Sequence, residues 1–461
     1  MSGSSISRAE RKQKRISSHL EKINMFAAGI DIGSETHFVA VPEELDDKPV
    51  RSFSCFTADL EALADWLVDL CITTVVMEST GIYWIPAFEI LESRGLDVKL
   101  VNARHVKNVA GRKSDVIDCQ WLLQLHTYGL LEGAFRPDDQ ICSLRSYRRQ
   151  RDMLVGCRSS HIQHMQKALR QMNLLLDNVV SDITGKTGMT IIRAIVDGER
   201  NSRVLAEHRD SRCKKSVAEI AKSLKGNYRD EHLFSLRQAV ELYDIYDQKI
   251  NACDKALEQK LKTFDSKDSD GLKPLSGSDR PLNKRKSRSA PDFDVRTELN
   301  RISGVDLTEI DGIDENTALK IVSEIGTDIS RWPSSKHFAS WLGLCPGTKI
   351  SGGKVLNKKT KRIPSAAATA FRMAAFTLAN SKSALGAYYR RMRSKQGAPK
   401  AITATAHKLA RLVYSMFKHG SQYVDEGQDY YERKYKDRVM KNLKQKALEM
   451  GFTLVPAETA S

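Results

Sequence analysis

Short apolar runs alternate with amphipathic patterns between residues 25 and 125, and this order constrains the fold more than any other feature of the chain. The predicted order is three strands, helix, strand, helix, strand, helix. Strands are expected twice within residues 25–41 and at residues 51–56, 73–77 and 96–102, and helices at residues 59–70, up to residue 91, and at residues 114–125. Such an order predicts a mixed sheet with helices packed on it, a fold in which sites gather at the carboxyl ends of strands.

Four carboxylates fall where this sheet would bring them together. Asp31 and Glu78 end strands that are predicted to be neighbours, and Asp115 and Asp118 share one helix face at i and i+3. Taken singly, each has a structural explanation as a turn residue, an exposed strand end or a partner for the positive end of a helix. Together they suit one or two Mg²⁺ ions, which need only a few carboxylates plus phosphate oxygens. Three other acids fit this edge less well: Glu35, Asp97 and Asp138.

The charge of residues 329–424 is a second constraint, because this block contains 18 Lys and Arg and no Asp or Glu. The whole chain has 73 basic and 57 acidic residues, so the rest of it holds 55 against 57. A field of this density repels itself unless a polyanion neutralises it. The structural alternative is a solvated basic surface, but charged surfaces normally intersperse both signs. The block therefore predicts nucleic-acid binding.

The middle of the chain predicts long helices. One helix rich in arginine is expected over residues 144–180, and a second run at residues 236–264 keeps roughly heptad spacing. This pattern favours a coiled-coil arm or helical hairpin over a globular core. Residues 265–294 lack apolar periodicity and predict a flexible linker. Residues 307–326 resemble a helix-hairpin-helix, with a purely structural helical hairpin as the alternative.

These patterns divide the chain into six segments. They are a basic arm (1–24), an α/β domain (25–138), a helical or coiled-coil region (139–264), a flexible linker (265–294), a C-terminal domain (295–425) and a helical tail (426–461). The eight scattered cysteines form no C-x-x-C pair, which argues against a zinc site and fits a reducing compartment. No apolar run approaches the roughly 20 residues that span a bilayer, so we expect a cytoplasmic protein.

Motifs towards both ends of the chain resemble the transposases of the insertion sequence 110 family, relatives of the Piv invertases. The motifs are Asp31-Ile-Gly with His37, Glu78-Ser-Thr-Gly-Ile-Tyr-Trp84, residues 102–118, and Trp341-Leu-Gly-Leu-Cys-Pro followed by Ser351-Gly-Gly-Lys354. The resemblance implies a RuvC-like, RNase H-type α/β domain with an Asp-Glu-Asp-Asp tetrad that binds metal, and a mainly α C-terminal domain with a nucleophilic serine. These catalytic residues are Asp31, Glu78, Asp115, Asp118 and Ser351.

Ser351 must be activated by a general base or metal from elsewhere in the assembly, because serine is a weak nucleophile and no acid lies near it in sequence. The resemblance implies a composite site in which the acids and Mg²⁺ of one subunit act with the serine of another, through a covalent phosphoserine. Gly352 and Gly353 would let backbone amides approach the scissile phosphate. The structural alternative is a Ser-Gly-Gly turn without chemistry.

The resemblance also implies partners: the DNA of the element ends and the target, a structured guide RNA from the element, and further copies of the chain in a dimer or tetramer. The predicted nucleic-acid contacts are Arg145, Arg148, Arg149, Gly352, Gly353, Lys354, Lys358, Lys359, Lys361 and Arg362. Basic residues alone do not distinguish RNA from DNA.

The predicted function is that of an insertion-sequence transposase, a Mg²⁺-dependent DNA recombinase. One alternative is a RuvC-like Holliday-junction resolvase or nuclease, which would activate water with the tetrad and not need Ser351. Another is a nucleic-acid-binding protein without catalysis. Only the serine mechanism predicts a DNA–protein adduct that survives denaturation.

Overall fold

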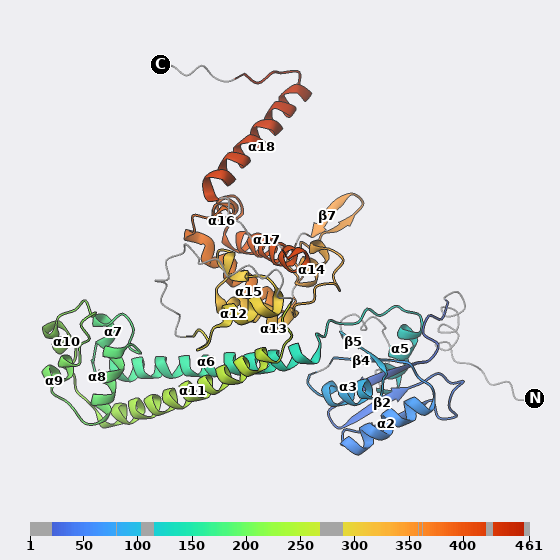
Figure 1. The fold of residues 1–461 in the computed structure, drawn as a ribbon, viewed down its shortest axis with the longest axis horizontal. Coiled ribbons are helices and arrows are strands. Elements are labelled where there is room, and N and C mark those ends of the chain that lie inside the picture. Colours follow the sequence, from blue (N-terminus) through green and yellow to red (C-terminus); the bar gives the residue numbers. More distant parts are fainter. Residues whose placement is uncertain are drawn as a thin grey trace, which may run out of the picture. The chain divides into compact units, whose positions relative to one another are not determined.

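The structure is a computed structural model that describes residues 21–79, 81–102, 115–267, 289–357, 359–361, 363–420 and 427–455. It divides into two compact units, Met1–Arg136 and Pro137–Ser461 (Figure 1). The first unit is mixed α/β, and the second is mostly helical. Most of the predicted basic arm and of the predicted linker lies outside the described residues. None of the described helices has the length and apolar composition that crossing a bilayer requires.

A five-stranded mixed sheet with the order β3-β2-β1-β4-β5 forms the centre of the N-terminal unit. Its strands are β1 (Ala27–Ile32), β2 (Thr36–Ala40), β3 (Val50–Ser54), β4 (Thr74–Glu78) and β5 (Asp97–Val101). The first three strands pair antiparallel, whereas β1, β4 and β5 run parallel. The predicted mixed sheet is confirmed, and each strand lies within two residues of its predicted position.

Side chains alternate between the two faces of this sheet. On one face the strands pack against α2 (Thr57–Asp69) and α3 (Trp84–Ser93), in a core that includes Ile30, Ile32, Val39, Met77, Leu63, Leu67 and Leu91. On the other face lies α5 (Asp115–Thr127), whose Leu122 packs with Val76 and Val101. The α5 face is the one that positions the candidate site.

Gly29 of β1 allows α5 to approach the sheet closely. A Cβ atom added to Gly29 would lie 2.5 Å from the Cys119 carbonyl oxygen and 2.9 Å from Leu123 Cα. Real Cβ atoms do not come this close to backbone, so the contact requires glycine. The helix backbone therefore rests directly on β1.

Two long helices, α6 (Asp139–Gln171) and α11 (Asp230–Lys262), run side by side in the C-terminal unit (Figure 1). A buried ion pair joins Arg151 to Asp254, and a partly exposed one joins Arg158 to Asp247. The predicted helix over residues 144–180 begins earlier and ends at Gln171, because the chain turns at Asn173, which has a left-handed φ of 56°. Asparagine adopts this conformation more readily than most residues.

A compact helical core lies between the far ends of these two helices. It is built from α7 (Leu176–Val179), α8 (Lys186–Val196), α9 (Ser202–Glu207) and α10 (Val217–Ser223). Their buried side chains, among them Ile191, Ile192, Leu205 and Ile220, close against apolar residues of α6 and α11. The helical hairpin therefore ends in a globular core, which the sequence reasoning did not expect.

The rest of the C-terminal unit is mainly helical. Its elements are α12 (Val295–Ser303), η1 (Leu307–Glu309), α13 (Glu315–Ile325), α14 (Ser335–Trp341), β6 (Lys349–Ser351), β7 (Lys354–Asn357), α15 (Ala366–Thr377), η2 (Leu378–Asn380), α16 (Ala384–Gln396), α17 (Ala398–His419) and α18 (Gly427–Glu449). Within the segment that resembles a helix-hairpin-helix, only a 3₁₀ turn precedes α13. The Gly312 turn packs onto α15, where an added Cβ would lie 2.6 Å from the Ala374 carbonyl oxygen. This packing favours the structural alternative.

Candidate active site

Asp31 and Glu78 lie side by side at the carboxyl edge of the sheet. β1 and β4 are parallel neighbours in which Ile30 faces Met77, so Asp31 and Glu78 occupy the next position on each strand. Each follows by two residues a position on the α5 face, so alternation places both carboxylates on that face. The predicted adjacency of the two strand ends is confirmed.

Asp115 and Asp118 lie in the first turn of α5. The next residue, Cys119, is fully buried, and its carbonyl oxygen lies against Gly29, two residues before Asp31. Burial raises the pKa of the Cys119 thiol to about 12, and the carboxylates of Asp31 and Asp118 act in the same direction. Both carboxylates therefore lie within electrostatic reach of one thiol. Asp115 is exposed at the start of the helix.

The donor chemistry of this edge fits a hard divalent cation. Asp31, Glu78, Asp115 and Asp118 supply only carboxylate oxygens, the ligands that Mg²⁺ prefers. Among the described residues, no three His, Cys, Asp or Glu side chains are already gathered closely enough to hold a metal ion. The structure thus places Asp31 and Glu78 on the face that α5 covers and Asp115 and Asp118 in the first turn of that helix, without gathering the four side chains into a closed site.

His37, which belongs to the same sequence motif as Asp31, lies on the opposite face. It pairs with Ile32 across β1 and β2, whereas Asp31 pairs with Phe38. Its side chain is buried, and its Nε2 atom is 3.7 Å from the Cys55 sulfur. Burial lowers the pKa of His37. This histidine is a core residue and not a member of the acid cluster.

Ser351 lies at the tip of an exposed β-hairpin in the other unit. It is the last residue of β6 and pairs with Lys354 of β7 across a two-residue turn. Gly352 and Gly353 have φ values of 52° and 73°, which is typical of the type I′ turn and costs glycine little. The serine and its two glycines are exposed. The hairpin therefore presents the serine hydroxyl and the turn backbone to solvent.

An aromatic cluster lies next to the hairpin in sequence, and the hairpin exposes apolar side chains of its own. The rings of Trp332, Phe338, Trp341 and Tyr414 pack together, and a bridge between Pro346 and Thr360 closes the hairpin's base. Ile350 is 64% exposed and Leu356 is 70% exposed. An isolated two-stranded hairpin is marginally stable, and exposed apolar groups mark interaction surfaces. The hairpin therefore presents exposed apolar side chains beside Ser351.

The predicted nucleic-acid contacts near Ser351 lie in the same exposed region. Gly352, Gly353, Lys354, Lys359 and Lys361 are exposed. Two further predicted contacts, Lys358 and Arg362, lie outside the described residues.

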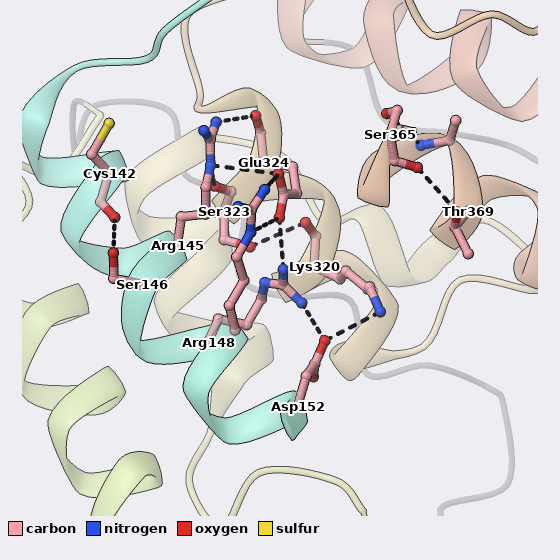
Figure 2. Close-up of polar contacts among 12 residues, drawn as sticks. Cys142, Arg145, Ser146, Arg148, Asp152, Lys320, Ser323, Glu324, Ser365 and Thr369 are labelled. Atoms are coloured by element: carbon pink, nitrogen blue, oxygen red, sulfur yellow. Dashed lines mark hydrogen bonds and ion pairs between the residues drawn. The ribbon is translucent and has the colours of Figure 1, made fainter. Parts of the chain in front are cut away.

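The arginines predicted to bind nucleic acid on α6 instead surround Glu324 of α13. Arg148 lies 2.6 Å from Glu324 Oε1, and Arg149 lies 2.9 Å from its Oε2. Arg145 donates to the Ser323 and Glu324 carbonyl oxygens at 3.2 and 2.7 Å (Figure 2). The Arg148 and Glu324 side chains are only 3% and 8% exposed. Donors that already bind a buried carboxylate are not available to a phosphate.

This arrangement corrects the interpretation of Arg145 and Arg148 as nucleic-acid contacts, whereas the Arg149 side chain is 57% exposed and its contact with nucleic acid stays a prediction. Burial lowers the pKa of Arg145, although the Glu324 charge opposes this effect. Asp152 extends the network, since it pairs with both Arg148 and Lys320 (Figure 2). The network ties α6 to α13. The one sequence signal for this network was Glu324, the single acid among the buried residues of α13.

Two family models match the chain. Residues 28–174 match the model of the DEDD domain of IS110 elements, described as a transposase. Residues 306–390 match a model described as the transposase IS116/IS110/IS902 family. The first match contains the four acids and the second contains Ser351, and together they cover about half of the chain. No curated protein matches it. The chain belongs to the IS110 family of transposases.

Proposed function

We propose that this transposase, a DNA-processing enzyme, is the recombinase of an insertion sequence and exchanges DNA strands through a phosphoserine at Ser351. The observation that carries the proposal is the presentation of Ser351. It stands at the tip of an exposed Gly-Gly turn, inside a block of 96 residues with no carboxylate. A purely structural turn has no need of either feature, whereas a nucleophile that must reach a DNA phosphate benefits from both.

The reaction keeps the phosphodiester bond energy within a covalent intermediate. The Ser351 Oγ attacks the scissile phosphorus and gives up its proton to a base, and the displaced nucleoside oxygen takes up a proton. The DNA phosphate is then an ester of the serine, and a hydroxyl of another strand displaces Ser351 to complete the exchange. The basic block stabilises the charge on the phosphoryl oxygens.

Asp31, Glu78, Asp115 and Asp118 would hold Mg²⁺ in an RNase H-type, RuvC-like domain, and the strand order and parallel edge of the sheet are consistent with that fold. Bound Mg²⁺ polarises a phosphate and lowers the pKa of a coordinated hydroxyl. The four carboxylates would orient the cation, and one of the chain's carboxylates would accept the proton that the serine loses. The placement that supports Asp31 and Glu78, on the α5 face at the carboxyl edge of the sheet, does not extend to the alternative acids Glu35, Asp97 and Asp138.

The serine and the acids belong to different compact units, and we infer that they meet in a composite site between copies of the chain, in a dimer or tetramer. The exposed Ile350 and Leu356 support this inference, because burial of the hairpin by another subunit would remove apolar surface from water. We further propose that the acid-free block binds the element's DNA and a structured guide RNA. We place this activity in the cytoplasm, in line with the scattered, unpaired cysteines.

The test is a covalent trap. Purified protein is incubated with Mg²⁺ and a labelled plasmid that carries the element with its flanking DNA, and the products are separated under denaturing conditions. The wild type and a Ser340→Ala control, which alters an exposed serine of α14, should give a protein–DNA adduct. Ser351→Ala should bind DNA normally and give none.

Alanine at Asp31, Glu78 or Asp118 should also abolish the adduct while the protein stays folded, because each change removes an oxygen ligand from a partly exposed position. An adduct that persists in Ser351→Ala would refute the serine mechanism. Cleavage without any adduct would instead support the water-activating nuclease, and binding without cleavage would support a non-catalytic protein.

A further inference from the structure

Two cations stack on tyrosine rings where α16, α17 and α18 meet. The Arg391 guanidinium carbon lies 3.9 Å from the centre of the Tyr435 ring and 5.3 Å from that of Tyr431. The Lys408 ammonium nitrogen lies 4.8 Å from the centre of the Tyr388 ring and 5.4 Å from that of Tyr431. Arg391 and Lys408 therefore share the Tyr431 ring.

Two more cations lie in the same place. The Arg438 guanidinium lies 5.5 Å from the Tyr435 ring, and the charges of Arg438 and Lys434 both act on Lys408. We call these residues the tyrosine–cation cluster: Tyr388, Arg391, Lys408, Tyr431, Lys434, Tyr435 and Arg438. The cluster lies outside the Ser351 hairpin and outside the region of Asp31, Glu78, Asp115 and Asp118, and the function proposed above does not use it.

No carboxylate neutralises this cluster within the described part of the chain. Burial is the main cause that lowers the pKa of Lys408, and the charges of Arg391, Arg438 and Lys434 lower it further. The acid Glu432 of α18 accepts a hydrogen bond from Gln428. Cations that share aromatic rings are attracted by the rings but still repel one another. Among the described residues, none of the cluster's cations therefore forms an ion pair with a carboxylate.

Polar atoms in the cluster also lack hydrogen bonds. The Arg391 Nε is buried and has no hydrogen-bond partner among the described residues, and the buried Tyr431 hydroxyl has only the Arg391 side chain beside it. Buried polar groups normally have at least one partner. Unsatisfied donors beside several uncompensated positive charges indicate a ligand that is anionic and rich in acceptor oxygens.

We propose that the tyrosine–cation cluster binds the phosphodiester backbone of a nucleic-acid strand. Phosphate oxygens accept hydrogen bonds from guanidinium, ammonium and phenol groups together. Tyrosine rings also offer stacking surfaces for bases, as in proteins that bind single strands. The inference rests on the proposed function only in taking nucleic acid as the polyanion. It adds α18 to the predicted nucleic-acid surface, which the sequence placed in the acid-free block 329–424 and on α6.

Lys408→Met separates this proposal from a structural role. Methionine keeps most of the apolar stem and removes one of the mutually repelling charges. If the cluster is only structural, the variant should unfold at an equal or higher temperature and bind nucleic acid as the wild type does. If the cluster holds phosphates, the variant should bind several-fold more weakly. The slope of log affinity against log salt should then fall by roughly 0.7 to 0.9 for each lost phosphate contact.

Lys260→Met on α11 is the matched control, because Lys260 lies outside the acid-free block. Its ammonium nitrogen lies 6.0 Å from the centre of the Phe264 ring, so it has similar chemistry with a single cation. If Lys408→Met fails to fold, Arg438→Gln on the exposed surface of α18 takes its place.

Affinity is measured by fluorescence anisotropy with the full chain, at a series of salt concentrations. The probes are a fluorescein-labelled single-stranded RNA, DNA of the same sequence, and the DNA duplex. Loss confined to the RNA probe identifies a guide-RNA contact, and loss confined to the DNA probes identifies an element or target contact. Unchanged affinity and slope for all probes in a folded variant would overturn the proposal. The covalent trap with Ser351→Ala tests the proposed function separately, so either can fail while the other stands.

Discussion

Replacing Gly29 with alanine tests whether the packing of α5 positions the acids. The added Cβ would start 2.5 Å from the Cys119 carbonyl oxygen, and ordinary contact begins at 3.4 Å. The three nearest atoms that it meets, from Cys119 and Leu123, all belong to backbone, so no side chain can rotate away. The helix must therefore move by about 1 Å from β1, at a cost in stability of roughly 1–3 kcal/mol for an overpacked core.

This movement carries Asp115 and Asp118 with it, since both lie within about one turn of Cys119. Asp31 and Glu78 stay on the strands. A misplacement of about 1 Å between reacting groups costs on the order of 100-fold in rate. We therefore expect Gly29→Ala to cleave DNA about 100-fold more slowly while it remains folded and binds nucleic acid normally.

The assay measures single-turnover cleavage of the plasmid at a temperature well below the unfolding transition of both proteins. Gly133→Ala is the control in the same unit, because its Cβ would meet Lys99 at an ordinary 3.8 Å. This control should keep the wild-type rate. Wild-type cleavage by Gly29→Ala would show that the approach of α5 does not set the position of the acids, and would refute the reasoning.

Two other changes probe interactions far from the reaction. Glu324→Gln leaves the buried Arg148 facing a neutral amide and should destabilise the C-terminal unit by about 3–5 kcal/mol in denaturant unfolding; Glu315→Gln on the same helix should not, and an equal effect of the two would contradict the assignment. Burial lowers the pKa of His126 to about 4, and its ring lies 2.9 Å from the Thr74 hydroxyl. The unfolded state binds the proton more tightly, so stability should fall by up to about 3 kcal/mol as pH drops from about 6.5 to 4. His126→Gln should flatten this dependence, and unchanged pH dependence would exclude His126 as its source.

The adjacency of Asp31 and Glu78 was predictable because local patterns determine it. A strand that ends at Asp31 and a buried run that ends at Glu78 need only the usual parallel pairing to become neighbours, and a helix puts Asp115 and Asp118 on one face. His37 shows the limit of such reasoning. It belongs to the same motif as Asp31, but alternation along β2 sends it to the other face of the sheet.

The partners of the α6 arginines could not be predicted, because Glu324 lies more than 170 residues away along the chain. A row of arginines looks the same in sequence whether it binds phosphate or a buried carboxylate. The helical core between α6 and α11 was missed for a similar reason. Its four helices are short, and their apolar residues come together only when the two long helices place both ends of the segment side by side.

The Gly-Gly turn after Ser351 also affects how the gene tolerates mutation. A single-base change at the first or second position of a glycine codon always removes the glycine or stops translation. Of the residues within reach, aspartate is the one that most readily adopts a positive φ. Aspartate would introduce a negative charge next to Ser351 in a block that has none. Substitutions of Gly352 or Gly353 therefore either strain the turn or change the charge beside the nucleophile. We expect such substitutions to be among the early ones that inactivate copies of the gene.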